Sequence, residues 1–413
     1  MKLVPNLMYV MSILSVIVYK VFTVQHITDI DFFTIYGIAV TAYILSRFVL
    51  AESYKYHGPM NEILPSVSVV IPAYNEEKHI EKTILHHVNS DYPKDRLEVI
   101  VVNDGSKDKT SQAVGEVARE NPGTSIKLID HSENLGKRKA LATGIRAATG
   151  DVIVTNDSDS FVDSDAVRRI VQPLQDATVG GVTGHADVFN WNENLLTRIQ
   201  YVRYFVAFRV YKAAESLYDS VICLSGCLAA YRKDTLMQLL DDWENQKFLG
   251  RLCTYGDDRG LTTFILRKGL KTIYEPHSIS ETVVPASFIG FWKQQLRWKK
   301  SWLRETYFVS KFMWRRHPVM SLSFYSNAFL TLFSFVIVVR VFFILPAIQS
   351  ALPTYYLIGL AIVALVYLAY CNKYGIYQGW MFPILWSVLY ALVLVWQIPI
   401  AALTLRDSRW GTR

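Results

Sequence analysis

The sequence predicts an α/β domain with a mostly parallel sheet and helices on both faces, inserted between apolar segments at the two chain ends. Two observations predict this arrangement. Between residues 67 and 155, β-branched runs alternate with segments of helical periodicity, which is typical of parallel sheets. Runs of about 20 apolar residues stand near both ends of the chain, and a membrane-spanning helix needs that length.

The composition excludes several classes of protein. The 413 residues are 51% hydrophobic, 13% aromatic and 19% charged, which is the opposite of the signature of disorder. The 21 glycines and 14 prolines are too few for a collagen-like chain. The four cysteines are too few and too scattered for a disulfide framework or a zinc site. The apolar excess makes a purely soluble protein doubtful.

The first 51 residues are expected to form a transmembrane hairpin. Leu7–Val24 and Phe32–Leu50 are almost wholly apolar, and the connection Gln25–Asp31 contains no Lys or Arg. The positive-inside rule places that connection outside and both ends of the hairpin in the cytoplasm. No cleavage site of the signal-peptide kind follows the first run.

Three further apolar runs follow residue 318: Phe324–Ile348, Leu352–Tyr370 and Met381–Leu405. If all three crossed the membrane, the arginine-rich tail would end outside, against the positive-inside rule. The last run contains two prolines, so it is predicted to be interfacial or re-entrant. The alternative for all these runs is a set of buried core helices in a soluble protein.

The middle of the chain defines each element of the predicted sheet. The predicted strands are Val67–Ile71, Leu97–Val102, Ile126–Ile129 and Val152–Thr155. The predicted helices are Glu77–Val88, Asp108–Arg119 and Lys137–Ala148. This order is Rossmann-like, and such sheets bind ligands beyond the carboxyl ends of their strands. The residues directly after the strands are therefore expected to carry the chemistry.

Those strand ends are acidic and lack the usual nucleotide-binding loops. Neither the G-x-G-x-x-G fingerprint nor a Walker A loop is present, so a dehydrogenase or P-loop ATPase is not expected. Asp104 follows the second strand, and Asp157 and Asp159 follow the fourth. Two carboxylates at i and i+2 on a turn can share Mg²⁺ or Mn²⁺ with substrate phosphates. The alternative is a solvated acidic turn.

Six motifs in order resemble a membrane-bound processive family-2 glycosyltransferase. They are PAYNEE (72–77), VVNDGSKD (101–108), NLGKRKA (134–140), NDSDS (156–160), GDDRGLT (256–262) and QQLRW (294–298). Within that superfamily the chain is similar to hyaluronan synthases and to chitin-oligosaccharide synthases. The terminal RWGTR (409–413) favours hyaluronan synthase, whereas LSGCL (224–228) departs from its usual CSGPL.

The resemblance implies an inverting transfer from a UDP-sugar and assigns donor-side roles. Nucleotide contacts are expected from Tyr74, Asn75, Glu76 and Asp104. Asp157 and Asp159 are expected to bring the metal to the diphosphate. Lys137 and Arg138 open a predicted helix, where two cations are unfavourable unless an anion binds there. That favours diphosphate or sugar contact over a solvated basic turn.

The acceptor side carries the base. The resemblance makes Asp258 the general base, with Asp257 as the alternative, and Arg259 is expected to hold the carboxylate in place. Ser225 and Gly226 are expected near the acceptor by resemblance only.

Further binding residues are expected on a helix and at the C-terminus. Gln294, Arg297 and Trp298 would share one helix face, so that Arg297 binds the diphosphate and Trp298 supports a sugar ring. Trp410 and Arg413 are expected to close over the nucleotide, the alternative being a frayed basic terminus. The basic, aromatic stretch Leu196–Lys212 is expected to lie on the membrane surface, the alternative being a core helix.

The predicted protein is a plasma-membrane synthase with a cytoplasmic catalytic domain. Its expected parts are a hairpin (1–51), a glycosyltransferase domain (52–283), interfacial helices (284–318) and a C-terminal membrane block with its tail (319–413). Its expected partners are UDP-GlcNAc, UDP-glucuronate, a growing hyaluronan chain and membrane lipid, with no nucleic acid, and a monomer is expected. One alternative is a chitin or poly-GlcNAc synthase that uses UDP-GlcNAc only. The other is a nucleotide-sugar-gated channel or exporter.

Overall fold

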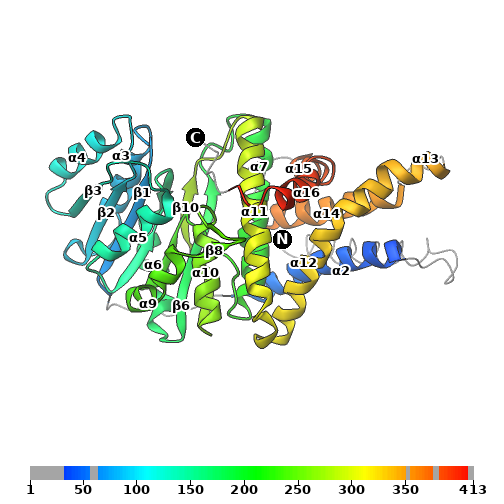
Figure 1. Ribbon diagram of the computed structural model, residues 1–413, viewed down its shortest axis with the longest axis horizontal. Coiled ribbons are helices and arrows are strands. Elements are labelled where there is room, and N and C mark those ends of the chain that lie inside the picture. The colour runs from blue at the N-terminus through cyan, green and yellow to red at the C-terminus, as the bar shows by residue number, and fades with distance from the viewer. Residues whose placement is uncertain (1–31, 56–63, 350–353, 375–380, 408–413) are drawn as a thin grey trace.

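A computed structural model of the chain describes residues 32–55, 64–349, 354–374 and 381–407. An α/β domain forms one side of the molecule, and the helices of the chain ends gather on the other (Figure 1). Helices α7 (Leu195–Val206) and α11 (Phe288–Ser310) stand between the two parts. The α/β fold expected from the sequence is confirmed.

The central sheet has eight strands in the order β3-β2-β1-β4-β7-β6-β10-β5. The first four are parallel, as predicted: β1 (Val67–Ala73), β2 (Leu97–Asn103), β3 (Ser125–Asp130) and β4 (Val152–Thr155). Strands β1, β2 and β4 are buried along their whole length, because helices cover both faces. Three predicted helices are also present, as α3 (Ile80–Val88), α4 (Thr110–Glu120) and α5 (Lys137–Ala147).

The other half of the sheet was not predicted. It consists of β5 (Ser160–Val162), β6 (Val179–Val188), β7 (Ala229–Arg232) and β10 (Lys271–Thr282). Strand β7 runs antiparallel between β4 and β6, and β10 is parallel to β6 but antiparallel to β5. Its helices are α6 (Ala166–Ile170), α9 (Lys233–Glu244) and α10 (Asp257–Arg267), and a separate hairpin joins β8 (Lys247–Phe248) to β9 (Arg251–Leu252).

The basic stretch at residues 196–212 is helical, as expected, but its position differs from the expectation. Helix α7 continues through a π-helix at Ala207–Lys212 into α8 (Ala213–Ser216). It packs against β6 on one side and against α15 (Met381–Leu392) on the other. Most of its apolar side chains are therefore buried in protein contacts rather than spread over a membrane surface.

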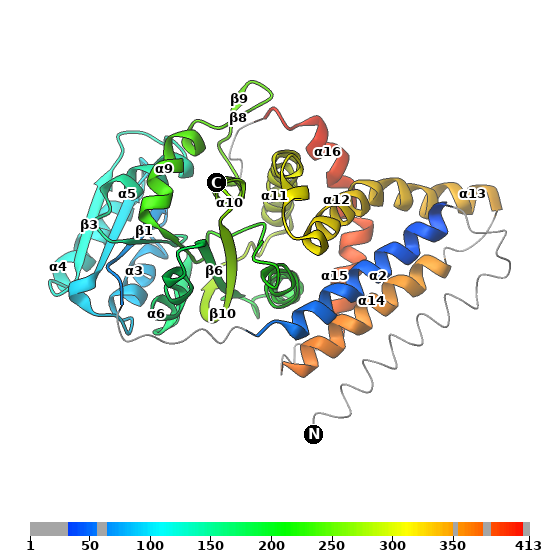
Figure 2. The ribbon, with the colours of Figure 1, turned by 90° about the horizontal axis from the view of Figure 1, so that it is seen from below.

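Within the described residues, three helical segments are long and apolar enough to span a membrane: Ile35–Ser53, Pro318–Ala347 and Ile384–Leu403. They belong to α2 (Phe32–Ser53), to α12 (Pro318–Val339) with its continuation into α13 (Leu345–Gln349), and to α15 with α16 (Gln397–Leu403). Figure 2 shows α2, α12 and α14 (Thr354–Lys373) extending away from the sheet. The expected first span, Leu7–Val24, lies outside the described residues.

The last apolar run is not one straight helix. A 3₁₀ turn at Leu394–Trp396 separates α15 from α16, and α16 packs along α11. The interruption fits the predicted interfacial or re-entrant segment, although its length and composition also allow a span. Its course through a membrane stays a prediction.

Between α2 and α12, Arg47 donates a 2.5 Å hydrogen bond to Ser323.

Candidate active site

A cavity of about 950 Å³ opens at the carboxyl ends of β1 and β4, between the sheet and helices α7 and α11. It reaches from Tyr74 and Asp104 at the sheet to Asn327 on α12. Fourteen of the residues singled out in the sequence line it: Tyr74, Glu76, Asp104, Lys137, Asp157, Asp159, Ser225, Gly226, Asp257, Asp258, Arg259, Gln294, Arg297 and Trp298. Segments far apart in the sequence thus converge on one space.

The loops after β1 and β2 form the sheet end of the cavity and hold each other. Asn75 has a left-handed backbone with φ 55°. Its N–H donates to the Ser106 hydroxyl at 2.8 Å, and its side-chain oxygen accepts the Lys107 N–H at 2.9 Å. Asn75 is exposed and does not line the cavity. Its hydrogen bonds instead join the loop that carries Tyr74 to the loop after β2.

Asp104 is committed to the loop that starts α5. Its carboxylate accepts the backbone N–H groups of Leu135 at 2.9 Å and Gly136 at 2.8 Å. The His131 ring nitrogen Nδ1 lies 2.8 Å from the same carboxylate. Sequence reasoning missed His131, which lacks a distinguishing pattern. The expected nucleotide contact of Asp104 stays a prediction, and the geometry adds that Asp104 fixes the start of α5.

Lys137 is the electrostatic centre of the cavity. Its ammonium lies 2.5 Å from Asp157 and 3.5 Å from Asp257. Burial alone would lower the pKa of Lys137, but the two carboxylates raise it well above its usual value. Gly226 closes over this cluster, since an added Cβ would lie 2.9 Å from Asp157 Oδ1. The Ser225–Gly226 backbone can therefore approach the charges closely.

Asp157 and Asp159 stand on the turn between β4 and β5. Burial and the neighbouring Asp157 carboxylate raise the pKa of Asp159 to about 7. Two carboxylates that repel each other in this way suit a hard divalent cation such as Mg²⁺ or Mn²⁺, which binds oxygen ligands. Among the described residues, no group of three or more His, Cys, Asp or Glu side chains is arranged to hold a metal. A cation here would therefore complete its shell with diphosphate oxygens and water.

The acidic pair Asp257 and Asp258 begins α10, after Gly256 in a left-handed conformation with φ 67°. Burial opposes ionisation of Asp257, but Lys137 outweighs it and holds the pKa of Asp257 below its usual value. The Asp258 carboxylate accepts the Arg259 N–H at 2.7 Å and lies 3.4 Å from the Cys223 thiol. Asp257 is thus ion-paired with Lys137, whereas Asp258 lines the cavity beside the Cys223 thiol.

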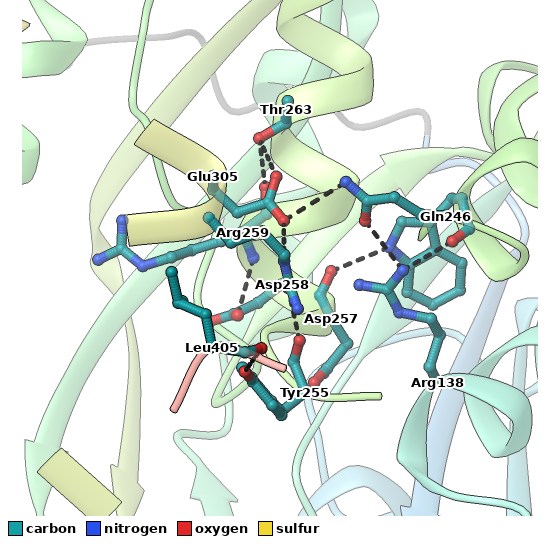
Figure 3. Close-up of polar contacts among 11 residues, drawn as sticks. Arg138, Gln246, Tyr255, Asp257, Asp258, Arg259, Thr263, Glu305 and Leu405 are labelled. Atoms are coloured by element: carbon teal, nitrogen blue, oxygen red, sulfur yellow. Dashed lines mark hydrogen bonds and ion pairs between the residues drawn. The ribbon is translucent and has the colours of Figure 1, made fainter. Parts of the chain in front are cut away.

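Arg259 holds Asp258 through its main chain rather than through its charge. Figure 3 shows the Arg259 backbone facing the Asp258 carboxylate while the guanidinium extends away from it. Helix α11 supplies the remaining predicted residues, because Gln294, Arg297 and Trp298 all line the cavity. The Arg203 guanidinium of α7 lies 4.6 Å from the Trp298 ring centroid, so the tryptophan joins α11 to α7.

Arg138 departs from the expectation that it contacts substrate. One residue after Lys137 on α5, it points to the opposite side and is 3% exposed. It donates to the Trp243 carbonyl at 2.7 Å and to the Gln246 side chain at 3.0 Å. Successive helix positions are turned by about 100°, so Lys137 and Arg138 leave α5 in different directions. The expected roles of Trp410 and Arg413 lie outside the described residues.

The end of the cavity toward α7 and α12 combines aromatic and charged side chains. Its aromatic walls are Tyr204, Phe208, Tyr211, Trp298 and Trp302. Its charged lining includes the cations Arg203, Lys212 and Arg259 and the carboxylates Glu215 and Asp258. Burial raises the pKa of Glu215, which disfavours its ionised form. This end suits flat sugar rings.

The comparisons with known proteins agree with this geometry. Residues 68–240 match the family described as "Glycosyl transferase family 2". An N-acetylglucosaminyltransferase from Azorhizobium caulinodans is 31% identical over 358 residues, covering 85% of this chain and 88% of that protein. Another from Mesorhizobium japonicum is 36% identical over 249 residues, but the match spans 60% of this chain and only 58% of that protein.

One solved structure has a similar fold. It is a mannosyltransferase from Pyrobaculum calidifontis in complex with GDP-Man and Mn²⁺, with a TM-score of 0.61 and 24% identity. It covers 87% of this chain and 98% of its own. The family model and the extended match to the Azorhizobium protein together show the family. The chain belongs to glycosyltransferase family 2.

Proposed function

We propose that this protein transfers N-acetylglucosamine from UDP-GlcNAc to the end of a growing GlcNAc chain, yielding a chitin-like oligosaccharide or polysaccharide. The observation that carries the proposal is the convergence of Lys137, the two acidic pairs and the α11 motif on one cavity. The match over 88% of an N-acetylglucosaminyltransferase supports the choice of sugar. This reverses the preference for hyaluronan drawn from the sequence.

The donor side binds the UDP diphosphate. When bound at Asp157 and Asp159, Mg²⁺ or Mn²⁺ supplies a Lewis acid that neutralises the leaving group. Lys137 lies 2.5 Å from Asp157 and is placed to share its charge with the phosphate oxygens. Arg297 offers a second, bidentate cation from α11. Tyr74 presents a ring to the uracil at the sheet end of the cavity.

The acceptor side supplies the proton acceptor. Asp258 removes the proton from the acceptor hydroxyl while that oxygen forms a bond to the anomeric carbon of the donor sugar. The bond from the anomeric carbon to the diphosphate oxygen breaks, and UDP leaves with its electron pair. Because attack and departure occur on opposite faces, the configuration inverts. Asp257 is less suited to this role, since Lys137 pairs with it.

A second product, hyaluronan, is favoured by one observation. The part of the cavity toward α7 and α12 is lined by Arg203, Lys212 and Arg259 beside the carboxylates of Glu215 and Asp258, and a glucuronate-bearing chain would need such cations. In that case UDP-glucuronate would be a second donor. A channel or exporter without catalysis leaves both acidic pairs and the α11 motif without a use.

The membrane helices suggest how the product leaves. The cavity continues from the sheet to Asn327 on α12, within a segment that is long and apolar enough to span a membrane. We therefore infer a plasma-membrane enzyme with a cytoplasmic catalytic domain (52–283) and interfacial helices (284–318). The terminal segments 1–51 and 319–413 would form the membrane part through which the growing chain passes.

The test uses purified full-length protein in detergent with Mg²⁺ or Mn²⁺. We expect polymer from UDP-GlcNAc alone, and none from the Asp258→Asn variant. Polymer only when UDP-GlcNAc and UDP-glucuronate are both present would establish the hyaluronan alternative. Absence of transfer with either mixture, in protein that still binds UDP, would support the exporter instead.

A further inference from the structure

Behind the turn that carries Asp257 and Asp258 lies a buried polar network whose members do not line the cavity. It comprises Arg138, Trp243, Gln246, Thr263, Arg304 and Glu305. Each of these side chains is at most 8% exposed. Figure 3 shows the network between α10 and α11. Buried charges are costly unless they are paired, so the network calls for an explanation.

Glu305 is the centre of this network. Its carboxylate accepts Arg304 Nε at 2.8 Å, the Thr263 hydroxyl at 2.9 Å and the Gln246 amide at 3.4 Å. The Gln246 side-chain oxygen in turn accepts Arg138 at 3.0 Å. Glu305 is therefore ion-paired with Arg304 and connected to Arg138 through Gln246, and Asp257 is a further carboxylate that interacts with Arg138.

The network forms hydrogen bonds to the main chain of the turn on both sides of Gly256. Arg304 Nη2 donates to the Tyr255 carbonyl at 2.6 Å, and the Trp243 indole N–H donates to the Asp257 carbonyl at 3.1 Å. An added Cβ on Gly256 would lie 1.9 Å from the Ser301 hydroxyl of α11. The two main-chain carbonyls that flank the turn are thus held by side chains from α9 and α11.

Three of the helices in the network also carry a residue of the cavity. Arg138 follows Lys137 on α5, and Thr263 lies on the same helix, α10, as Asp258. On α11, Arg304 lies seven positions after Arg297, which brings these two to nearly the same helix face. The network therefore links the three helices whose first turns or motifs meet the substrate.

We propose that Glu305 and Arg304 are positioning residues for the acidic pair, acting through the Tyr255–Asp258 turn rather than on the substrate. The proposal deepens the proposed glycosyl transfer and rests on it for its kinetic part. Without the Glu305 charge, the buried Arg304 guanidinium loses its ion pair, and Arg138 keeps Asp257 as a nearby carboxylate. Arg304 then loses the partner that aims it at the Tyr255 carbonyl, and the Asp258 carboxylate loses its fixed position toward the acceptor hydroxyl.

The experiment compares Glu305→Gln with a matched variant, Glu98→Gln. Glu98 is also a buried carboxylate, with hydrogen bonds from Lys127, at 2.6 Å, and from Thr149. It lies at the amino ends of β1 and β2, away from the cavity. Both variants are made in the full-length protein. UDP-GlcNAc transfer, UDP binding with Mn²⁺, thermal unfolding and amide hydrogen exchange are measured for each.

Both substitutions are expected to lower the unfolding temperature. Only Glu305→Gln should lower kcat, by about a hundredfold, with the donor KM and the UDP Kd within about threefold of wild type. Exchange at residues 255–263 should accelerate in Glu305→Gln alone. Arg304→Lys keeps the charge but has one nitrogen for two acceptors, so it should recover part of the loss seen in Arg304→Met.

Two results would overturn the proposal. One is a kcat of Glu305→Gln that falls no more than that of Glu98→Gln after correction for the folded fraction. The other is unchanged hydrogen exchange at residues 255–263. If the wild-type protein transfers no sugar, the proposed function fails, whereas the exchange experiment still decides whether the network holds the turn.

Discussion

At the scale of the residue, neighbouring side chains of like charge have different tasks. Lys137 faces the cavity and joins Asp157 to Asp257, whereas Arg138 points into the buried network. Asp257 is ion-paired, whereas Asp258 is bonded by a main-chain N–H and lies beside a thiol. The sequence places each pair together, and only the helix geometry separates their roles.

Substitution of the two carboxylates of the acidic pair should therefore change different kinetic constants. Asp258→Asn is expected to lower kcat by at least about a hundredfold with little change in donor KM, because it removes the base. Asp257→Asn is expected to raise the donor KM, because Lys137 loses a partner and reorients. Steady-state kinetics with UDP-GlcNAc distinguish them. Loss of kcat in Asp257→Asn with normal kcat in Asp258→Asn would exchange the assignments.

Asp159 is expected to destabilise the metal-free fold and to bind the metal ion. Burial and Asp157 raise its pKa to about 7, so its ionised form is disfavoured in the fold without a cation. Asp159→Asn is therefore expected to unfold at a higher temperature than wild type in a chelator. It should also lose the increase in unfolding temperature that Mn²⁺ gives the wild-type protein. An unchanged metal response in the variant would remove Asp159 from the site.

Glu98 predicts a pH dependence of stability. Burial acts to raise its pKa, but hydrogen bonds from Lys127 and two hydroxyl side chains outweigh this and lower the pKa to about 2. A carboxyl group whose pKa is lowered by folding stabilises the fold at pH values above its ordinary pKa. This stabilisation is lost as the pH falls toward the lowered pKa. Unfolding free energy should therefore drop between about pH 5 and pH 2, and less steeply in Glu98→Gln. Parallel curves would contradict this.

At the scale of the element, the approach of α11 to α10 depends on one glycine. Gly256 has φ 67°, and any Cβ there would meet Ser301. Gly256→Ala is expected to reduce both transfer and folded yield. Gly250 has φ 79° with open space around its added Cβ, so Gly250→Ala carries only the backbone strain, about 1 kcal/mol. Transfer activity and the free energy of unfolding in denaturant are measured for both variants. Equal losses of activity and stability in the two variants would refute the steric clash at Gly256.

Elements with strong local signals were predictable from the sequence. Strands β1, β2 and β4 are rich in Val and Ile, β3 is a short Ile- and Leu-containing segment, and the helices between them have clear periodicity. Strand β6 contains three glycines and β10 contains a proline, so local preference does not reveal them. Their positions come from long-range pairing. The Glu305 network was missed for a similar reason, since its charges on α11 look like a solvated basic stretch.

At the scale of the whole molecule, the site lies where the sheet meets the helices of the chain ends. Three apolar helical segments in the part of the chain that the structure describes are long enough to span a membrane. We expect the full-length protein to remain in the membrane fraction after an alkaline carbonate wash and to require detergent for extraction. Release by the wash would instead support the soluble alternative. Fractionation followed by immunoblotting, with a peripheral protein as the control, decides between them.

The pairing of β5 has a consequence for the timing of synthesis. Strand β5 follows Asp157 and Asp159 directly, yet its ladder partner in the sheet is β10, and Ser160 meets Thr282 across 122 residues of chain. While the ribosome is still adding those residues, the acidic turn has no strand to hold it. A nascent chain arrested before residue 271 should therefore lack the donor site, although its first four parallel strands are already complete.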